Sequence, residues 1–316
     1  MKQQVLIVLI LVILAGLLGW VSIKRVNQGL TTPLPVYLDK TKTFGVYSLN
    51  LWLPNIGNII SSFIDKPQIT AKSALVYDLT HEKLLYSKNP SVRLPIASLV
   101  KIMTAVVTLE NTELIEVYRV SEQAASIGEN SMGLTSGEQL TAEELLYGLL
   151  LVSGNDAAEV LAENFVGGRT NFVSAMNDKA KTLGLTDTFF INPSGLAEES
   201  EEYSTAHDLL VLTKYAMNIT KFAEIAGTYE RVIPYSQYHK AFYLYNDTNL
   251  LTTYPGVKGV KPGYTPEAGL CLVTYAQNGG HQLIGIILGS ESRREEMREL
   301  LDYSFKTLGV KIPGRN

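Results

Sequence analysis

The sequence has little of what metal sites and disulfides require. Its 316 residues include one cysteine, Cys271, and four histidines that are not spaced as pairs. A single cysteine excludes an intrachain disulfide and a zinc site with several cysteine ligands, and the scattered histidines do not indicate a catalytic metal. We therefore expect neither a metal nor a cofactor. The formal net charge is only −4, with no basic stripe among aromatic residues, so nucleic acid is not an expected partner.

Long uncharged runs are also scarce, and the most prominent one lies near the N-terminus. Val5–Ile23 has 19 residues without a charge, preceded by Lys2 and followed by Lys24 and Arg25. As a helix it would span about 28 Å, close to the thickness of a bilayer core. The run has no clear Ala-x-Ala cleavage site, which favours an uncleaved transmembrane anchor. The alternative is a signal peptide that is removed to leave a secreted protein.

Composition divides the chain into three regions. Residues 1–27 are the predicted anchor or signal segment, 28–68 form a membrane-proximal connector with several prolines, and 69–316 form one globular domain. Within the connector, residues 49–63 are apolar and include Trp52. Because no cationic face accompanies this stretch, we expect it to pack on the globular domain rather than on a membrane surface.

Strand and helix patterns in the globular domain predict an α/β fold of the α+β type. Strands are expected at both ends, around a middle in which helical patterns dominate from residue 121 to about 252. The expected strands are 73–78, 83–87, 269–276 and 282–288, and the expected helices are 141–152, 157–165, 171–183, 205–217 and 293–308. This order predicts one antiparallel sheet built from both ends of the domain, with flanking helices and a mainly helical lobe.

A hydroxyl and an amine lie three residues apart at the start of an apolar helical pattern. Ser98 and Lys101 open the run Ile96–Leu109, whose apolar residues recur with helical spacing. Positions i and i+3 share one helix face, about 5–6 Å apart. Burial there would lower the pKa of the Lys101 amine and make it a usable base, while N–H groups at the helix start would stabilise negative charge. The alternative is a helix-capping serine beside a solvated lysine.

Two further short elements can accompany this pair. Ser153 and Asn155 lie between two expected helices, where a tight turn can direct a hydroxyl and a carboxamide into one cleft; taken alone, they indicate ordinary helix caps. Lys261 and Gly263 precede the expected strand 269–276. A lysine on an edge strand beside a cleft would attract a carboxylate, and the glycine would permit close backbone approach. The simpler interpretation is a surface turn.

Together, the three elements in this order resemble the D-alanyl-D-alanine carboxypeptidases, a branch of the low-molecular-mass penicillin-binding proteins. The likeness covers roughly Ser73–Leu308. Other stretches that follow the family's pattern are Leu94–Ala105, Ser131–Leu134 with Gly137 and Glu138, Leu145–Ala158, Asn192–Leu196, Tyr203–Leu209 and Asn246–Leu251.

The resemblance implies a penicillin-binding, β-lactamase-like transpeptidase fold, with 69–316 as a serine D,D-peptidase domain. It implies an enzyme that removes the terminal D-alanine from peptidoglycan stem peptides. By family role Ser98 is the acyl-enzyme nucleophile, Lys101 is the general base, and Ser153 passes a proton to the departing D-alanine. Peptidoglycan stem peptides would be the substrates and β-lactam antibiotics covalent inhibitors. The catalytic domain would lie outside the cytoplasm at the bacterial cell membrane, attached by the N-terminal anchor.

The same resemblance assigns the binding residues. Asn155 would orient the substrate and Lys261 would attract its terminal carboxylate. Gly263 would let the backbone approach closely, and the N–H groups of Ser98 and Tyr264 would form the oxyanion hole, in which one donor typically contributes about 3–4 kcal/mol.

Two departures from the family pattern qualify this expectation. Pro262 stands where the family usually has a threonine whose hydroxyl helps to bind the substrate carboxylate. A catalytically weak wall-binding homologue is therefore an alternative, and so are a D,D-endopeptidase and a class A-like β-lactamase. Many family members also carry a second, small β-domain and a C-terminal amphipathic helix. We expect neither, because the chain given ends at Asn316, soon after the helix expected over 293–308.

Overall fold

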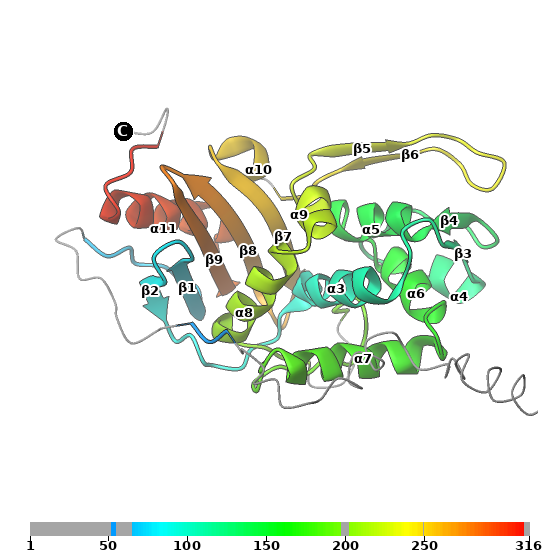
Figure 1. Ribbon diagram of the computed structural model, residues 1–316, viewed down its shortest axis with the longest axis horizontal. Helices are drawn as coiled ribbons and strands as arrows, with labels where there is room; N and C mark the ends of the chain where they lie inside the picture. Colours follow the sequence, from blue (N-terminus) through cyan, green and yellow to red (C-terminus); the bar gives the residue numbers. More distant parts are fainter. Residues whose placement is uncertain (1–51, 55–64, 197–201, 249, 313–316) are drawn as a thin grey trace, which may run out of the picture. The chain divides into compact units, whose positions relative to one another are not determined.

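A five-stranded antiparallel sheet joins the two ends of the globular domain (Figure 1). Its strands are, in order, β2 (Lys83–Lys88), β1 (Ser73–Asp78), β9 (His281–Ser290), β8 (Gly269–Asn278) and β7 (Val257–Thr265). β1 pairs with both β2 and β9, so the hairpin from the start of the domain and the hairpin from its end form one sheet. The predicted sheet built from both ends is confirmed, and β7 is an edge strand.

The computed structural model describes residues 52–54, 65–196, 202–248 and 250–312. The predicted anchor and most of the connector lie outside these ranges, and no helix within them is both long and apolar enough to span a bilayer. Of the connector's apolar stretch, Trp52 is described. Its ring meets Tyr77 edge-on with 5.8 Å between centroids, and the Lys214 ammonium lies 3.5 Å from its centroid. This piece packs on the globular domain, as expected.

The two faces of the sheet are covered by different helices. Alternate residues of β1, β8 and β9, including Val76, Leu272 and Ile287, pack with Met297 and Leu300 of α11 (Arg293–Thr307) in one buried apolar cluster. α8 (Ala206–Met217) contacts β1 and β9. Burial on both faces explains why β8 and β9 are almost continuously apolar rather than alternating.

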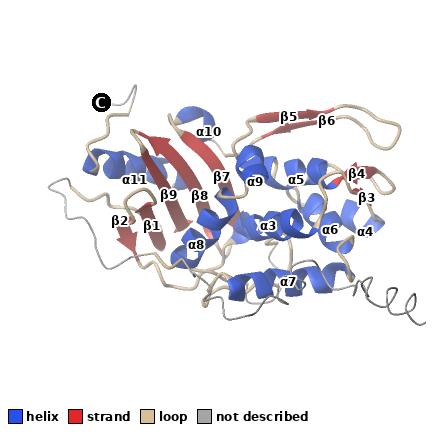
Figure 2. Ribbon diagram, viewed as in Figure 1, coloured by secondary structure: helices blue, strands red, loops and turns tan. Residues whose placement is uncertain are grey.

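Helices dominate the chain between β2 and β7 (Figure 2). The central one, α3, contacts five other helices, α5 to α9. The bounds are α3 (Lys101–Asn111), α4 (Glu122–Ala125), α5 (Ala142–Leu151), α6 (Asn155–Glu163), α7 (Gly168–Thr182), α9 (Thr220–Ala226) and α10 (Leu250–Thr253). The predicted helical lobe is therefore present, with most helix ends within three residues of the expected ones.

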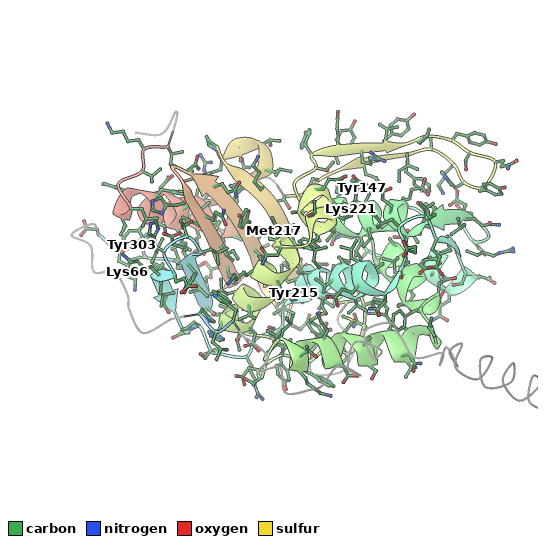
Figure 3. The ribbon with its side chains drawn as sticks, viewed as in Figure 1. Lys66, Tyr147, Tyr215, Met217, Lys221 and Tyr303 are labelled. Atoms are coloured by element: carbon green, nitrogen blue, oxygen red, sulfur yellow. The ribbon has the colours of Figure 1, made fainter. Side chains whose placement is uncertain are left out.

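Local sequence signals explain how the lobe is held together. Thr141 and Glu144 form a capping box at the start of α5, each side chain accepting the other's backbone N–H. Tyr147 of α5 donates a hydrogen bond to Glu224 of α9 at 3.2 Å, and Lys221 of α9 pairs with Glu143 of α5 at 3.1 Å (Figure 3). These polar contacts fix α9 against α5 beside the apolar core.

The expectation that helices dominate up to about residue 252 is wrong in one place. The chain forms a hairpin there, with β5 (Glu230–Ile233) paired to β6 (Phe242–Tyr245). Phe242 and Leu244 are buried while Tyr243 and Tyr245 are exposed, a period of two with aromatic residues that favours a strand. A shorter pair, β3 (Val117–Arg119) with β4 (Gln139–Thr141), was also not predicted.

Candidate active site

The stretch around Ser98 is not one continuous helix. A 3-10 helix, η2 (Ala97–Val100), comes first, and α3 begins at Lys101. Ser98 therefore lies in the 3-10 turn rather than at the first position of the α-helix, which corrects the expectation for Ile96–Leu109. Ala97 has φ = 49°, a left-handed conformation that costs energy in a residue with a Cβ atom. The surrounding structure thus holds the serine on a strained, well-defined turn.

Two glycines let other segments approach this turn closely. A Cβ atom on Gly195 would lie 2.1 Å from the carbonyl oxygen of Ala97, a distance no side chain can occupy. A Cβ atom on Gly263 of β7 would lie 3.1 Å from the backbone nitrogen of Ser98. The structure therefore places the edge strand directly beside the serine, and Gly263 is where the two backbones come together.

Lys101 connects three segments of the site through hydrogen bonds of its amine. Its side chain is fully buried, and Nζ lies 3.0 Å from Ser98 Oγ, 2.7 Å from Asn155 Oδ1 and 2.6 Å from the carbonyl oxygen of Ser194. All three partners are uncharged. Burial, reinforced by the positive charge of Lys261, holds the pKa of the Lys101 ammonium well below its usual value. A neutral amine at this position can accept the proton of the Ser98 hydroxyl.

Ser153 and Asn155 lie at the junction of α5 and α6. Ser153 has φ = 59° and is 1% exposed, and its Oγ has no hydrogen-bond partner among the residues described. A strained backbone together with a buried hydroxyl that lacks a partner is typical of residues that bind a ligand or take part in catalysis. Asn155 begins α6, and its amide donates to the carbonyl of Gly128 at 3.2 Å while its oxygen faces Lys101.

The third element lies on β7. Lys261 is fully buried, with Nζ 3.5 Å from both carboxylate oxygens of Asp247. Burial lowers the pKa of Lys261, and the charge and hydrogen bond of Asp247 oppose that shift. Lys101 and Lys261 are near enough for the charge of one to act on the other. The two buried amines therefore lie close enough to interact, one beside neutral oxygens and one beside a carboxylate.

Pro262 indicates the direction in which alternate backbone N–H groups of β7 point. It is paired with Leu272 of β8, and without an N–H it cannot donate to that strand. Successive N–H groups along a strand point alternately to its two sides. The N–H of Tyr264 therefore points the same way as the Pro262 nitrogen, away from β8 and outward from this edge of the sheet. The Tyr264 side chain itself is 60% exposed.

Three charged residues of the site were not foreseen from the sequence. Asp247 lies in a stretch singled out only for its family likeness, and no local pattern pairs it with Lys261. Arg293, at the start of α11, donates from Nη1 to the carbonyl of Gly263 at 2.5 Å. Asp156, 1% exposed, accepts backbone N–H groups from Met132, Gly133 and Leu134 at 2.9 Å and so ties a loop to the start of α6 beside Asn155.

Comparison with known proteins identifies a family with this arrangement. The family described as "D-alanyl-D-alanine carboxypeptidase" matches residues 61–292. A D-alanyl-D-alanine carboxypeptidase of Bacillus subtilis is 39% identical over 74% of this chain and 62% of its own length. One of Mycobacterium tuberculosis is 36% identical over 76% of this chain and 84% of its own. A D-alanyl-D-alanine endopeptidase of Pseudomonas aeruginosa is 35% identical over 65% and 67%. The chain thus spans less than two thirds of the Bacillus relative.

Solved structures confirm the fold. A DD-transpeptidase from a Streptomyces strain superposes with a TM-score of 0.72 at 30% identity, covering 77% of this chain and all of that one. A D-alanyl-D-alanine carboxypeptidase of Mycobacterium tuberculosis gives the same TM-score at 34% identity, covering 77% of this chain and 94% of that one. The predicted transpeptidase-type fold, an antiparallel sheet with a helical lobe, is therefore confirmed.

Proposed function

Because the chain belongs to the D-alanyl-D-alanine carboxypeptidase family, we propose that it is a serine-type enzyme that removes the terminal D-alanine from peptidoglycan stem peptides. The observation that carries this proposal is the 3.0 Å contact between Ser98 Oγ and the fully buried Nζ of Lys101. A hydroxyl beside a desolvated amine is an activated nucleophile paired with its base.

Acylation of Ser98 follows from the geometry. Oγ attacks the carbonyl carbon of the penultimate D-alanine, and its proton passes to the neutral amine of Lys101. The N–H groups of Ser98 and Tyr264 would stabilise the oxyanion that develops, and such donors act most strongly in a site closed to water. The intermediate then collapses: the peptide C–N bond breaks, and an acyl-enzyme forms on Ser98.

The leaving D-alanine amine needs a proton as that bond breaks. We assign this relay to Ser153; what supports the assignment is that its hydroxyl is buried without a hydrogen-bond partner among the described residues. The proton that Lys101 took from Ser98 can return through this hydroxyl to the amine. Water then attacks the acyl-enzyme, again by transfer of a proton to Lys101, and releases the shortened peptide.

Substrate binding rests on charge and on the amide of Asn155. The terminal carboxylate of the substrate is negative, and Lys261 and Arg293 place two positive charges at the middle of β7. Asn155, already held by Gly128 and Lys101, is oriented to meet the substrate backbone. Pro262 contributes no hydroxyl here. We propose that β-lactams, which carry a carboxylate and a reactive carbonyl, acylate the same serine.

The test is release of D-alanine from a peptide ending in D-Ala-D-Ala. We expect release by the wild type and loss to the background rate in Ser98→Ala. Ser126→Ala, a change of an exposed serine in another segment, should keep full activity. A wild-type protein that binds the peptide without releasing D-alanine would instead support the wall-binding alternative. Preferential cleavage of the crosslink between two joined stem peptides would support an endopeptidase.

The location follows the substrate. Peptidoglycan lies outside the cytoplasm, so the catalytic domain must act there. We propose that residues 1–27 attach it to the membrane, because the uncharged run Val5–Ile23 is long enough to span a bilayer. Full-length protein should then remain with the membrane fraction after a salt wash. A mature N-terminus beyond about residue 20 would show that the segment is a cleaved signal peptide.

A further inference from the structure

Two turns from opposite ends of the chain meet at one end of the sheet. Asp78 is the last residue of β1, His81 lies in the turn that follows, and His281 is the first residue of β9. Asp78 and His281 are 203 residues apart in sequence, yet the register of β1 against β9 brings them together. The sequence showed four scattered histidines, and only the fold makes two of them neighbours.

The three side chains converge on one point. Oδ2 of Asp78 lies 2.9 Å from Nδ1 of His81 and 2.9 Å from Nδ1 of His281. The two rings are 4.8 Å apart between centroids, and the three potential ligand atoms all lie within 4.8 Å of one another. Asp78 is fully buried, whereas the side chains of His281 and His81 are 15% and 50% exposed. The group is thus anchored on one side and open to solvent on the other.

A second layer of hydrogen bonds orients the carboxylate. The backbone N–H of Thr80 donates to Oδ1 of Asp78 at 2.9 Å, which leaves Oδ2 to the histidines. The hydroxyl of Thr80 accepts the N–H of Gln282 at 3.0 Å, and the N–H of Leu79 donates to the carbonyl of Gln282 at 2.8 Å. Support of this kind is what holds metal ligands in a fixed orientation.

We propose that Asp78, His81 and His281 bind a divalent transition-metal ion, with Zn²⁺ as the representative case. Two imidazoles and one carboxylate are ligands that such ions favour. An ion about 2.1 Å from each ligand in tetrahedral geometry would separate the ligand atoms by about 3.4 Å. The two imidazole nitrogens must therefore approach each other by at most about 1.4 Å, and each must move about 0.5 Å away from Oδ2 of Asp78. The half-exposed side chain of His81 permits this adjustment. Solvent on the open side supplies the remaining ligand.

The site would join two hairpins rather than take part in catalysis. Lys261 lies on β7, which is three strands from Asp78 on β1 and two strands from His281 on β9, so the ion would lie away from the strand of the active site. A metal held by residues from both ends of the chain stabilises the folded sheet, because the unfolded chain does not bring those ligands together. Binding should therefore raise the melting temperature and leave D-alanine release unchanged.

The experiment uses the full chain in detergent, purified without a histidine tag and stripped of metal with a chelator. Titration calorimetry with ZnCl₂ should show one saturable site, and MgCl₂, which prefers oxygen ligands, should show none. At about 100 times the dissociation constant, Zn²⁺ should raise Tm by about 5–10 °C. His281→Asn and His81→Asn should each weaken Zn²⁺ binding by more than the roughly 10- to 100-fold cost of losing an outer-shell partner.

The matched control is His207→Asn. His207 also faces a carboxylate, that of Asp208 at 3.4 Å, but belongs to another segment. This variant should bind Zn²⁺ like the wild type. Zn²⁺ binding that survives His281→Asn with its affinity intact, or that His207→Asn abolishes, would overturn the proposal, as would the absence of saturable binding by the wild type. Melting curves of the metal-free variants establish that each is folded.

Discussion

The two buried lysines of the candidate site differ mainly in what surrounds them. Lys101 and Lys261 are both fully buried, and burial lowers the pKa of each. Among the described residues, the Lys101 amine donates to neutral oxygens, such as Oδ1 of Asn155, and the positive charge of Lys261 also acts on it. The Lys261 amine faces the carboxylate of Asp247, which favours its charged form. Burial beside neutral acceptors favours the neutral amine of Lys101, whereas the carboxylate beside Lys261 opposes the same effect of burial.

This difference divides the work of the site between two parts of the fold. Lys101 comes from the helical lobe, which carries Ser153 and Asn155 as well, and in the proposed mechanism these residues handle the proton transfers. Lys261 comes from the edge of the sheet, and in the same proposal it attracts the substrate carboxylate. Because the two amines repel each other, a protonated Lys261 helps to keep Lys101 neutral. Binding charge and catalytic base are thus coupled through one electrostatic interaction.

Exchanging each lysine for arginine should separate the two roles most strongly. Arginine keeps the positive charge but cannot lose a proton, so Lys101→Arg should lower kcat/KM for D-alanine release by about 10²- to 10⁴-fold, the usual contribution of a general base. Lys261→Arg retains a cation for the carboxylate. It should therefore lose less than Lys261→Met, with most of the loss in KM.

Two results would contradict the different roles assigned to Lys101 and Lys261. If Lys101→Arg stays active, Lys101 acts only as a charge, and another group must take the proton from Ser98. Equal losses in Lys261→Arg and Lys261→Met would mean that the Lys261 charge does not bind substrate. Thermal melting of all three variants shows whether the larger guanidinium is accommodated in each buried position.

Pro262→Thr tests how the strand of Lys261 binds the substrate carboxylate, and its expected effect is smaller. Proline breaks no sheet hydrogen bond here, because the N–H of this position would point away from β8. The variant gains a hydroxyl beside the substrate carboxylate, a contact to a charged group worth about 1.5–3 kcal/mol. We expect kcat/KM for D-alanine release to rise by about 10- to 150-fold, since each 1.36 kcal/mol is tenfold. An unchanged or lower value would mean that Thr265 or another donor already fills this role.

The sequence allowed the sheet, the helical lobe and the short motifs to be predicted, because periodicity and motif spacing are local properties. It did not reveal that Ser98 lies in a 3-10 turn, since four residues are too few to distinguish a period of 3.0 from the 3.6 of an α-helix. The hairpin of β5 and β6 was also missed. Its strands have four residues each, too few for period two to outweigh the helical patterns around them.

Long-range partners were the least predictable part of the site. Asp247 next to Lys261, and Arg293 next to Gly263, are pairings that only the folded sheet creates. The hydroxyl of Ser153 has no hydrogen-bond partner among the described residues because of its φ of 59° and its burial. Neither property can be predicted from a serine in a turn between two helices. Residue types near the motifs were visible in the sequence, but their electrostatic roles were not.

The most direct test of the central claim is the rate at which benzylpenicillin acylates the protein as a function of pH, followed by intact mass and peptide mapping. We predict one acyl group, on Ser98, and a rate that rises with pH as Lys101 loses its proton. Because the pKa of Lys101 in the folded protein is depressed, this rise should be complete well below pH 10.5, the ordinary value for lysine. A rate that rises only near that pH, an adduct on another residue, or no adduct after prolonged exposure would contradict the account.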